Sequence, residues 1–213
     1  MDRQTVREWV AQELQAVQPT PAAPPKPLHN PGAWTLAPFF VADRSPSAAD
    51  APGLGPRSDA ASTRCVAIGS DHGGFDLKRR LLELLGELGV EAVDCGTYSA
   101  SSCDYPDFAV AVGRAVQSGR CGLGIMIDGA GIGSAMALNK LPGIRAATVH
   151  SEATAVNSRE HNDANVLVLG SLQMNPGHAR RIVRIWLATP HAGGRHALRV
   201  DKINALDRKE ATS

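Results

Sequence analysis

Residues 122–140 read GLGIMIDGAGIGSAMALNK: an apolar run, an acid, three glycines at every second position and a helix-forming segment. The apolar run predicts a buried strand over 123–129, and the segment 134–143 predicts a short helix. Glycines at such a turn let the backbone approach a ligand, and successive N–H groups form an anion-binding concavity. Asp128, at the mouth of the loop, is therefore a candidate base, a ligand or only a turn residue.

Strand-like runs alternate with helical periodicity through the rest of the chain from about residue 64. This alternation predicts βαβ units and a doubly wound, mainly parallel sheet in a Rossmann-like three-layer α/β sandwich. Right-handed crossovers place the carboxyl ends of all strands on one edge, where ligands of such sheets bind. The expected strands are 65–71, 90–96, 123–129, 144–151 and 165–171, and the expected helices are 75–89, 107–119, 134–143, 152–162, 176–190 and a polar tail from Arg195.

The chain divides into three segments by composition. Residues 1–18 have helical spacing of apolar side chains along one face, which predicts an isolated amphipathic helix. Residues 19–63 hold ten of the fourteen prolines, mixed with Ala, Ser and Asp, which is typical of an extended linker. The apolar patch WTLAPFFV at 34–41 is expected to dock on the globular domain or on a partner. Residues 64–213 form the globular domain.

Composition excludes several classes of function. The net charge of +1, from 22 basic and 21 acidic residues, gives no electrostatic basis for binding nucleic acid or an anionic membrane. No apolar run is long enough to span a membrane, and the N-terminus lacks the apolar core of a secretory signal. The four cysteines form no CxxC pair, so we expect no metal site and reduced thiols in a cytoplasm.

The glycine loop alone permits two further interpretations. Gly129 and Gly131 fit the first two glycines of a dinucleotide fingerprint, with Ser134 in the place of the third and Glu152 at a suitable distance for the ribose acid. Against a nucleotide site, the loop lies in the middle of the domain rather than after its first strand. The other interpretation is a tight turn that binds no ligand.

Six separated motifs together carry a family resemblance: GSDHGGFDLK (69–78), DYPDFA (104–109), DGAGIGSAMALNK (128–140), GIRAA (143–147), SREHNDANVLVLGS (158–171) and GGRHALRV (193–200). In this order they resemble the ribose-5-phosphate isomerase type B family, which includes the galactose-6-phosphate isomerase subunits, over about 64–208. The resemblance implies a homodimer, or a dimer of dimers, with shared sites. It also implies an aldose–ketose isomerisation of a sugar phosphate, first of all ribose 5-phosphate, through an enediolate without metal or cofactor.

The resemblance also implies a role for each site residue. A positioned base and fixed N–H donors must share the work, because the α-proton of a sugar carbonyl is weakly acidic. The implied roles are Asp128 as base; amides of Gly129, Gly131 and Gly133 at the oxyanion; His161 in ring opening beside Asn162; Asp71 and His72 on the sugar hydroxyls or the phosphate; Tyr105 in positioning the sugar; and Arg195 and Arg199 on the phosphate. Each of these residues, taken singly, also has a purely structural interpretation. Asp71 can cap the following helix, and His161 can be a partly buried histidine whose hydrogen bonds are satisfied. Arg195 and Arg199 can form a solvated helix face.

The chain also departs from the family pattern. Family members usually have Cys at the position of Asp128 and Thr at that of Ala130, and another branch takes its base from a Glu at the position of Ser134. A family Arg is replaced by Leu172, so one phosphate contact is missing. Asp128 is the only acid in the loop, and a non-catalytic sugar-phosphate-binding relative remains the alternative to an isomerase.

The N-terminal helix resembles the encapsulation peptides that recruit enzymes into bacterial microcompartments. An apolar stripe gains stability by packing on a shell or on another cargo helix, and a linker would separate it from the enzyme. The alternatives are a helix that docks on its own domain, a membrane-surface helix and a transit peptide. The polar face of the helix is not basic, which argues against a membrane surface. The acidic residues of the segment argue against a transit peptide. The stripe consists of Val6, Trp9, Val10, Leu14 and Val17.

Overall fold

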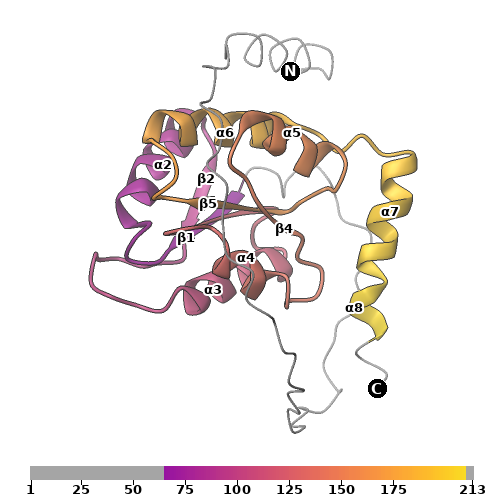
Figure 1. Cartoon of the computed structure of the whole chain (residues 1–213), viewed down its shortest axis with the longest axis horizontal. Coiled ribbons are helices and arrows are strands. Elements are labelled where there is room, and N and C mark those ends of the chain that lie inside the picture. The colour runs from indigo at the N-terminus through magenta and orange to yellow at the C-terminus, as the bar shows by residue number, and fades with distance from the viewer. Residues whose placement is uncertain (1–64, 210–213) are drawn as a thin grey trace, which may run out of the picture.

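A computed structural model describes residues 65–209, which form a five-stranded sheet with the order β2-β1-β3-β5-β4 (Figure 1). All four neighbouring pairs are parallel, so the predicted fold class is confirmed. The predicted N-terminal helix and linker lie outside the described residues. The strands are β1 (Cys65–Ser70), β2 (Glu91–Asp94), β3 (Leu123–Asp128), β4 (Ala146–Thr148) and β5 (Val166–Gly170).

Helices cover both faces of the sheet. The helices α2 (Phe75–Glu87), α5 (Glu152–Glu160) and α6 (Pro176–Ala188) cover one face, and α3 (Tyr105–Gln117) and α4 (Gly133–Leu138) cover the other (Figure 1). The last two helices, α7 (Arg195–Asn204) and α8 (Leu206–Lys209), lie to the side, beyond β4. Within residues 65–209, no helix combines the length and apolar character needed to cross a membrane.

The three central strands are buried along their whole length, as expected for a parallel sheet with both faces covered. Their side chains alternate between the two cores: Ile125 and Ile127 face the core with α2 and α6, and Met126 faces the core with α3 and α4. The register pairs Ile127 with Ser70 and Asp128 with Gly170. The loops that follow β1, β3 and β5 therefore emerge side by side at the carboxyl edge.

Two predicted elements differ most from the expected lengths. The helix after the glycine loop ends at Leu138 rather than at residue 143, and the strand predicted over 144–151 is reduced to β4 (Ala146–Thr148). The strand is short because it lies at the edge of the sheet and pairs only with β5, from Ala146 opposite Val166 to Thr148 opposite Val168.

The expectation of four reduced thiols is wrong, because Cys65 and Cys121 form a disulfide. The pairing follows from the sheet: Val66 lies opposite Leu123, so the residues just before β1 and β3 meet, with their Cα atoms 4.8 Å apart. A search for short CxxC spacing misses this pair, which is separated by 56 residues. Cys95 and Cys103 are free thiols.

Reduction of this disulfide is expected to destabilise the domain, because a cross-link restricts the unfolded chain. The chain-entropy relation gives about 4 kcal/mol for a closed loop of this length. We therefore expect Cys121→Ser and the reduced wild-type protein to unfold at a similarly lower urea concentration than the oxidised protein. Cys95→Ser is the control, and equal midpoints for the oxidised and reduced wild type would contradict the expectation.

Candidate active site

The carboxylate of Asp128 organises the glycine loop from inside. It is 4% exposed and accepts four hydrogen bonds. Its Oδ1 receives the amides of Ala130, at 2.9 Å, and Gly131. Its Oδ2 receives the amide of Ser134 at 3.1 Å and the hydroxyl of the same residue at 2.5 Å. A carboxylate offers about four acceptor positions, so the folded loop uses all of them.

This arrangement divides the loop amides into two groups. The amides of Ala130 and Gly131 point inward to Asp128, whereas those of Gly129, Ile132 and Gly133 have no acceptor among residues 65–209. Gly131 has a φ of +75°, a conformation in which a side chain is strained, and its carbonyl accepts a 2.6 Å hydrogen bond from Thr148. Gly131 therefore shapes the turn, and the outward amides are the donors available to an anion.

The neighbouring loops at the carboxyl edge are tied to the glycine loop through the turn after β5. Ser171 donates its amide to the carbonyl of Asp128 at 2.8 Å and its hydroxyl to the carbonyl of Gly73 at 2.9 Å. The amide of Leu172 donates to the carbonyl of Gly129 at 3.1 Å. The sequence interpretation missed Ser171, because only the strand order brings residues 73 and 171 together.

The loops after β1 and β2 supply the remaining predicted side chains at the carboxyl edge of the sheet. Asp71 is buried, and its Oδ1 accepts the amide of Gly74 at 2.9 Å, so it does stabilise the turn before α2. The ring of Tyr105 lies against Gly133, where a Cβ atom would come 2.5 Å from the ring. His72 is exposed, and its Nδ1 accepts the amide of Cys103 at 3.3 Å. The carboxyl edge thus gathers Asp71, His72, Tyr105, Asp128 and the three glycines.

The other predicted site residues lie at the opposite edge of the sheet. α5 starts after the carboxyl end of β4 and runs back, so His161 and Asn162 follow it at the amino edge, just before β5. α7 approaches the same place, because the rings of His161 and His196 are stacked with centroids 4.1 Å apart. Arg195 and Arg199 are exposed on this helix. In a single chain the structure does not bring these four predicted residues to the glycine loop.

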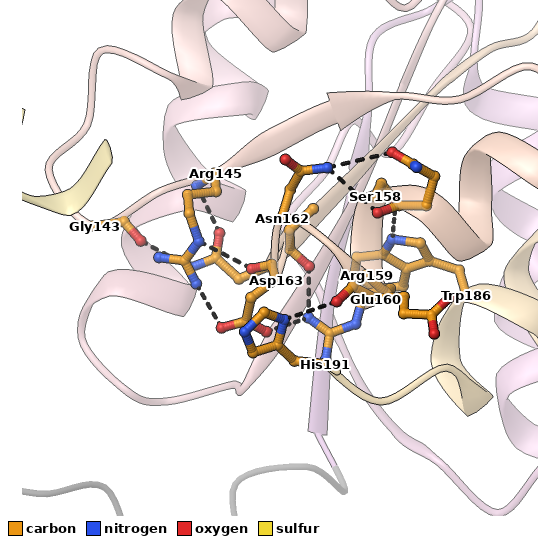
Figure 2. A network of polar contacts seen from close by, with 12 residues as sticks. Gly143, Arg145, Ser158, Arg159, Glu160, Asn162, Asp163, Trp186 and His191 are labelled. Carbon is orange, nitrogen blue, oxygen red and sulfur yellow. Dashed lines mark hydrogen bonds and ion pairs between the residues drawn. The ribbon is translucent and has the colours of Figure 1, made fainter. Parts of the chain in front are cut away.

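The predicted residues at the amino edge lie beside a partly buried polar network (Figure 2). Asp163 has a φ of 45° and places its carboxylate between Arg145 and Arg159, at 2.9 Å from each. Arg145 also donates to Asn204 of α7 at 3.0 Å, and Arg159 lies over the ring of Trp186. The sequence interpretation missed these contacts, because they join α5, α6 and α7 to the loop residues Arg145 and Asp163. Their contacts fix the chain on both sides of His161 and Asn162 and hold α7 in place.

The positive charge around His161 and His196 comes from Arg195 and Arg199. Desolvation, together with the nearby His161, Arg195 and Arg199, lowers the pKa of His196. His196 is therefore expected to be neutral at pH 7, while the guanidinium groups remain charged. Two exposed arginines beside this stacked histidine pair suit a phosphate, because arginine forks match phosphate oxygens.

Glu152, the acid that a dinucleotide site would require, is already paired within the fold. It is buried and accepts hydrogen bonds from Arg181 at 3.0 Å and from His178 at 3.2 Å, both on α6. These contacts fix α5 against α6 and leave the carboxylate no free face for a ribose hydroxyl. The geometry therefore does not favour the nucleotide interpretation.

Cys103, beside His72 at the carboxyl edge of the sheet, is expected to be the more reactive of the two free thiols. Its Sγ lies 3.9 Å from Nδ1 of His72, whereas burial, followed by the charge of Asp94, raises the pKa of the Cys95 thiol. An aromatic disulfide reagent should therefore modify Cys103 at least about tenfold faster than Cys95. Thiol release measured with Cys103→Ser and Cys95→Ser separates the two, and a fast phase that survives in Cys103→Ser would contradict the assignment.

Comparisons with known proteins agree with this geometry. A family model described as Ribose/Galactose Isomerase matches residues 66–203. A putative sugar phosphate isomerase of Bacillus subtilis is 46% identical over 145 residues, 68% of this chain and 97% of the relative. Ribose-5-phosphate isomerase B of Escherichia coli is 43% identical over 144 residues, again 68% of this chain and 97% of the relative.

Solved structures show the same similarity. Ribose-5-phosphate isomerase B of Clostridium thermocellum has a TM-score of 0.68 and 48% identity, covering 68% of this chain and 99% of that protein. The enzyme of Mycoplasma genitalium, solved with bound ribulose 5-phosphate, has a TM-score of 0.66 and 40% identity, covering 68% of this chain and 97% of that protein. Residues 1–65 lie outside the family match.

Proposed function

The chain belongs to the ribose/galactose isomerase family, and from this premise we propose that it interconverts ribose 5-phosphate and ribulose 5-phosphate. The observation that carries the proposal is the glycine loop, whose outward amides form a donor site beside Asp71, His72 and Tyr105. These are the groups needed to hold a sugar carbonyl and to stabilise a negative oxygen.

The chemistry is a proton transfer between neighbouring carbons. A base removes the C2 proton of the open-chain aldose, and the C1 carbonyl oxygen becomes the enediolate oxygen. The base then returns its proton to C1, and the C2 hydroxyl proton passes to the C1 oxygen, which leaves a C1 hydroxyl and a C2 ketone. The amides of Gly129, Ile132 and Gly133 are proposed to stabilise the developing charge, and Asp128 is the proposed base. Support for Asp128 is its place beside these amides, at the end of β3.

A second copy of the chain is proposed to complete the site. One chain carries the glycine loop at the carboxyl edge of the sheet and His161, Asn162, Arg195 and Arg199 at the amino edge. A homodimer, or a dimer of dimers, in which the amino edge of one copy faces the carboxyl edge of another would unite them. His161 would then assist ring opening, and the two arginines would bind the phosphate.

Leu172 bears on the choice of substrate. Its side chain is 85% exposed and would contact a Cβ atom placed on Gly129, so it lies at the rim of the glycine loop. A leucine side chain has neither a hydrogen-bond donor nor a positive charge with which to bind a phosphate. Binding of the phosphate therefore rests on Arg195 and Arg199, and the substrate should be sought in a panel of pentose and hexose phosphates rather than with ribose 5-phosphate alone.

A non-catalytic sugar-phosphate-binding protein is the second candidate, favoured by the four hydrogen bonds that already occupy Asp128. Incubation of each sugar phosphate in D₂O separates the two. An isomerase forms ketose product and exchanges the C2 proton, both seen by NMR, whereas a binding protein raises the melting temperature with its ligand and exchanges nothing. Neither product nor exchange with any sugar phosphate of the panel would refute the isomerase.

We also propose that residues 1–18 recruit the enzyme to a bacterial microcompartment. The support is the apolar stripe of Val6, Trp9, Val10, Leu14 and Val17, followed by a proline-rich segment outside the family match. A fluorescent protein fused to residues 1–20 should form foci in cells that produce compartment shells. The same fusion with Trp9→Glu and Leu14→Glu is the control, and diffuse fluorescence of the unmodified fusion would refute the proposal.

A further inference from the structure

We propose that Ser134 is a positioning residue that allows Asp128 to take up a proton and return it. The inference rests on the proposed function, in which Asp128 is the base, and adds Ser134, to which the sequence interpretation gave no role in the isomerase reaction. It starts from the four hydrogen bonds of the Asp128 carboxylate.

The contact between the two side chains is direct and buried. Ser134 is 0% exposed, and Asp128 is 4% exposed. The Ser134 hydroxyl donates to Oδ2 of Asp128 at 2.5 Å, and its own amide donates to the same oxygen at 3.1 Å. No other side chain among residues 65–209 hydrogen-bonds to this carboxylate.

The four donors differ in what they can do when Asp128 becomes protonated. Three are backbone N–H groups, of Ala130, Gly131 and Ser134, which can only donate and therefore favour the carboxylate. The Ser134 hydroxyl is different, because it can rotate and become an acceptor. It is the one partner that can receive a hydrogen bond from the carboxylic acid.

A catalytic base must be stable in both of its protonation states. A buried O–H without an acceptor costs roughly 1–3 kcal/mol, so a protonated Asp128 surrounded only by amides would be disfavoured. When the carboxylate takes the C2 proton of the sugar, the Ser134 hydroxyl reverses its hydrogen bond and accepts the new O–H. When the proton moves to C1, the hydroxyl donates again.

Thr148, the last residue of β4, provides a matched control that contacts the same loop. Its hydroxyl donates to the carbonyl of Gly131 at 2.6 Å and does not touch the carboxylate. Replacement of Thr148 by Val removes a β4 hydroxyl that hydrogen-bonds to the loop and leaves a side chain of similar size. A general loosening of the loop would therefore follow from either substitution, whereas only Ser134→Ala removes the reversible partner of Asp128.

The test compares the pH dependence of kcat for wild type, Ser134→Ala and Thr148→Val. Ser134→Ala should lower kcat about tenfold or more with little change in KM. It should also move the acid limb of the profile to higher pH by up to about one unit, because the hydrogen bond to the charged base is stronger than that to its neutral form. Thr148→Val should leave the acid limb in place.

An acid limb unchanged in Ser134→Ala would overturn the proposal, as would an equal displacement in Thr148→Val. Should Ser134→Ala not fold, Ser134→Cys fills the site with a weaker hydrogen-bonding group, and the same upward displacement is expected. Failure of the proposed function is a separate result, since the wild-type protein would then show neither ketose formation nor C2 exchange in D₂O.

Discussion

Replacement of Asp128 by Asn is expected to lower kcat by about three orders of magnitude, the scale on which a general base contributes. The variant removes the proposed proton acceptor. It also presents an NH₂ group to amides that now donate to the carboxylate, so the loop loses at least one of its four hydrogen bonds. Ketose formation and C2 exchange should fall together, and the melting temperature should fall as well.

A matched carboxylate is available near the site. Asp107 is exposed in the first turn of α3, two residues after Tyr105, and its conversion to Asn should leave kcat unchanged. Full turnover by Asp128→Asn would assign the base to another group. A folded Asp128→Asn variant that binds the sugar phosphate but does not exchange its proton would instead support the assignment.

Mixing two inactive variants is expected to restore activity when they carry substitutions in opposite halves of the site. Asp128→Asn removes the carboxyl-edge half, and a variant with His161→Ala and Arg195→Ala removes the amino-edge half. If each site takes one half from each copy, a mixed dimer has one intact site. Random association of equal amounts should then recover about a quarter of the wild-type activity, from almost none in either variant.

The control uses two variants of the same half. Asp128→Asn mixed with Tyr105→Ala should recover nothing, because both substitutions fall at the carboxyl edge and every site of a dimer that combines them is defective. Activity should be measured after joint unfolding and refolding, with wild type treated in the same way. A mixture of opposite-half variants that stays inactive would show that the two edges do not meet between copies.

The fold could be predicted because its strands are marked by apolar runs and its loops by glycine and polar residues. The apolar runs at 65–70, 123–128 and 166–170 are buried on both faces, so these strands must lie in the interior of a sheet that is covered on both sides. The edge strand β4 was overestimated, since an edge strand need not be apolar along its whole length. The pairing of Cys65 with Cys121 depends on strand order, which local patterns do not contain.

The residue types of the candidate site could be predicted from the sequence, but the orientation and position of these residues in the fold could not. The sequence places Asp128 before three glycines, but only the folded turn directs the amides of Ala130 and Gly131 back to it. Likewise, spacing brings Arg195 and Arg199 onto one face of a helix, yet their position at the amino edge depends on the contact of α7 with Arg145 and His161. Such long-range contacts arise from tertiary packing.

The disulfide at the start of β1 also has a mechanical consequence. Residue 65 is where the preceding 64 residues join the described fold, and β1 lies between β2 and β3. A pull applied through the N-terminus therefore acts along an interior strand, where the interstrand hydrogen bonds resist in shear and must rupture together. The bond to Cys121 passes part of that load to the approach to β3, so the enzyme can be held by its leading segment without being peeled open.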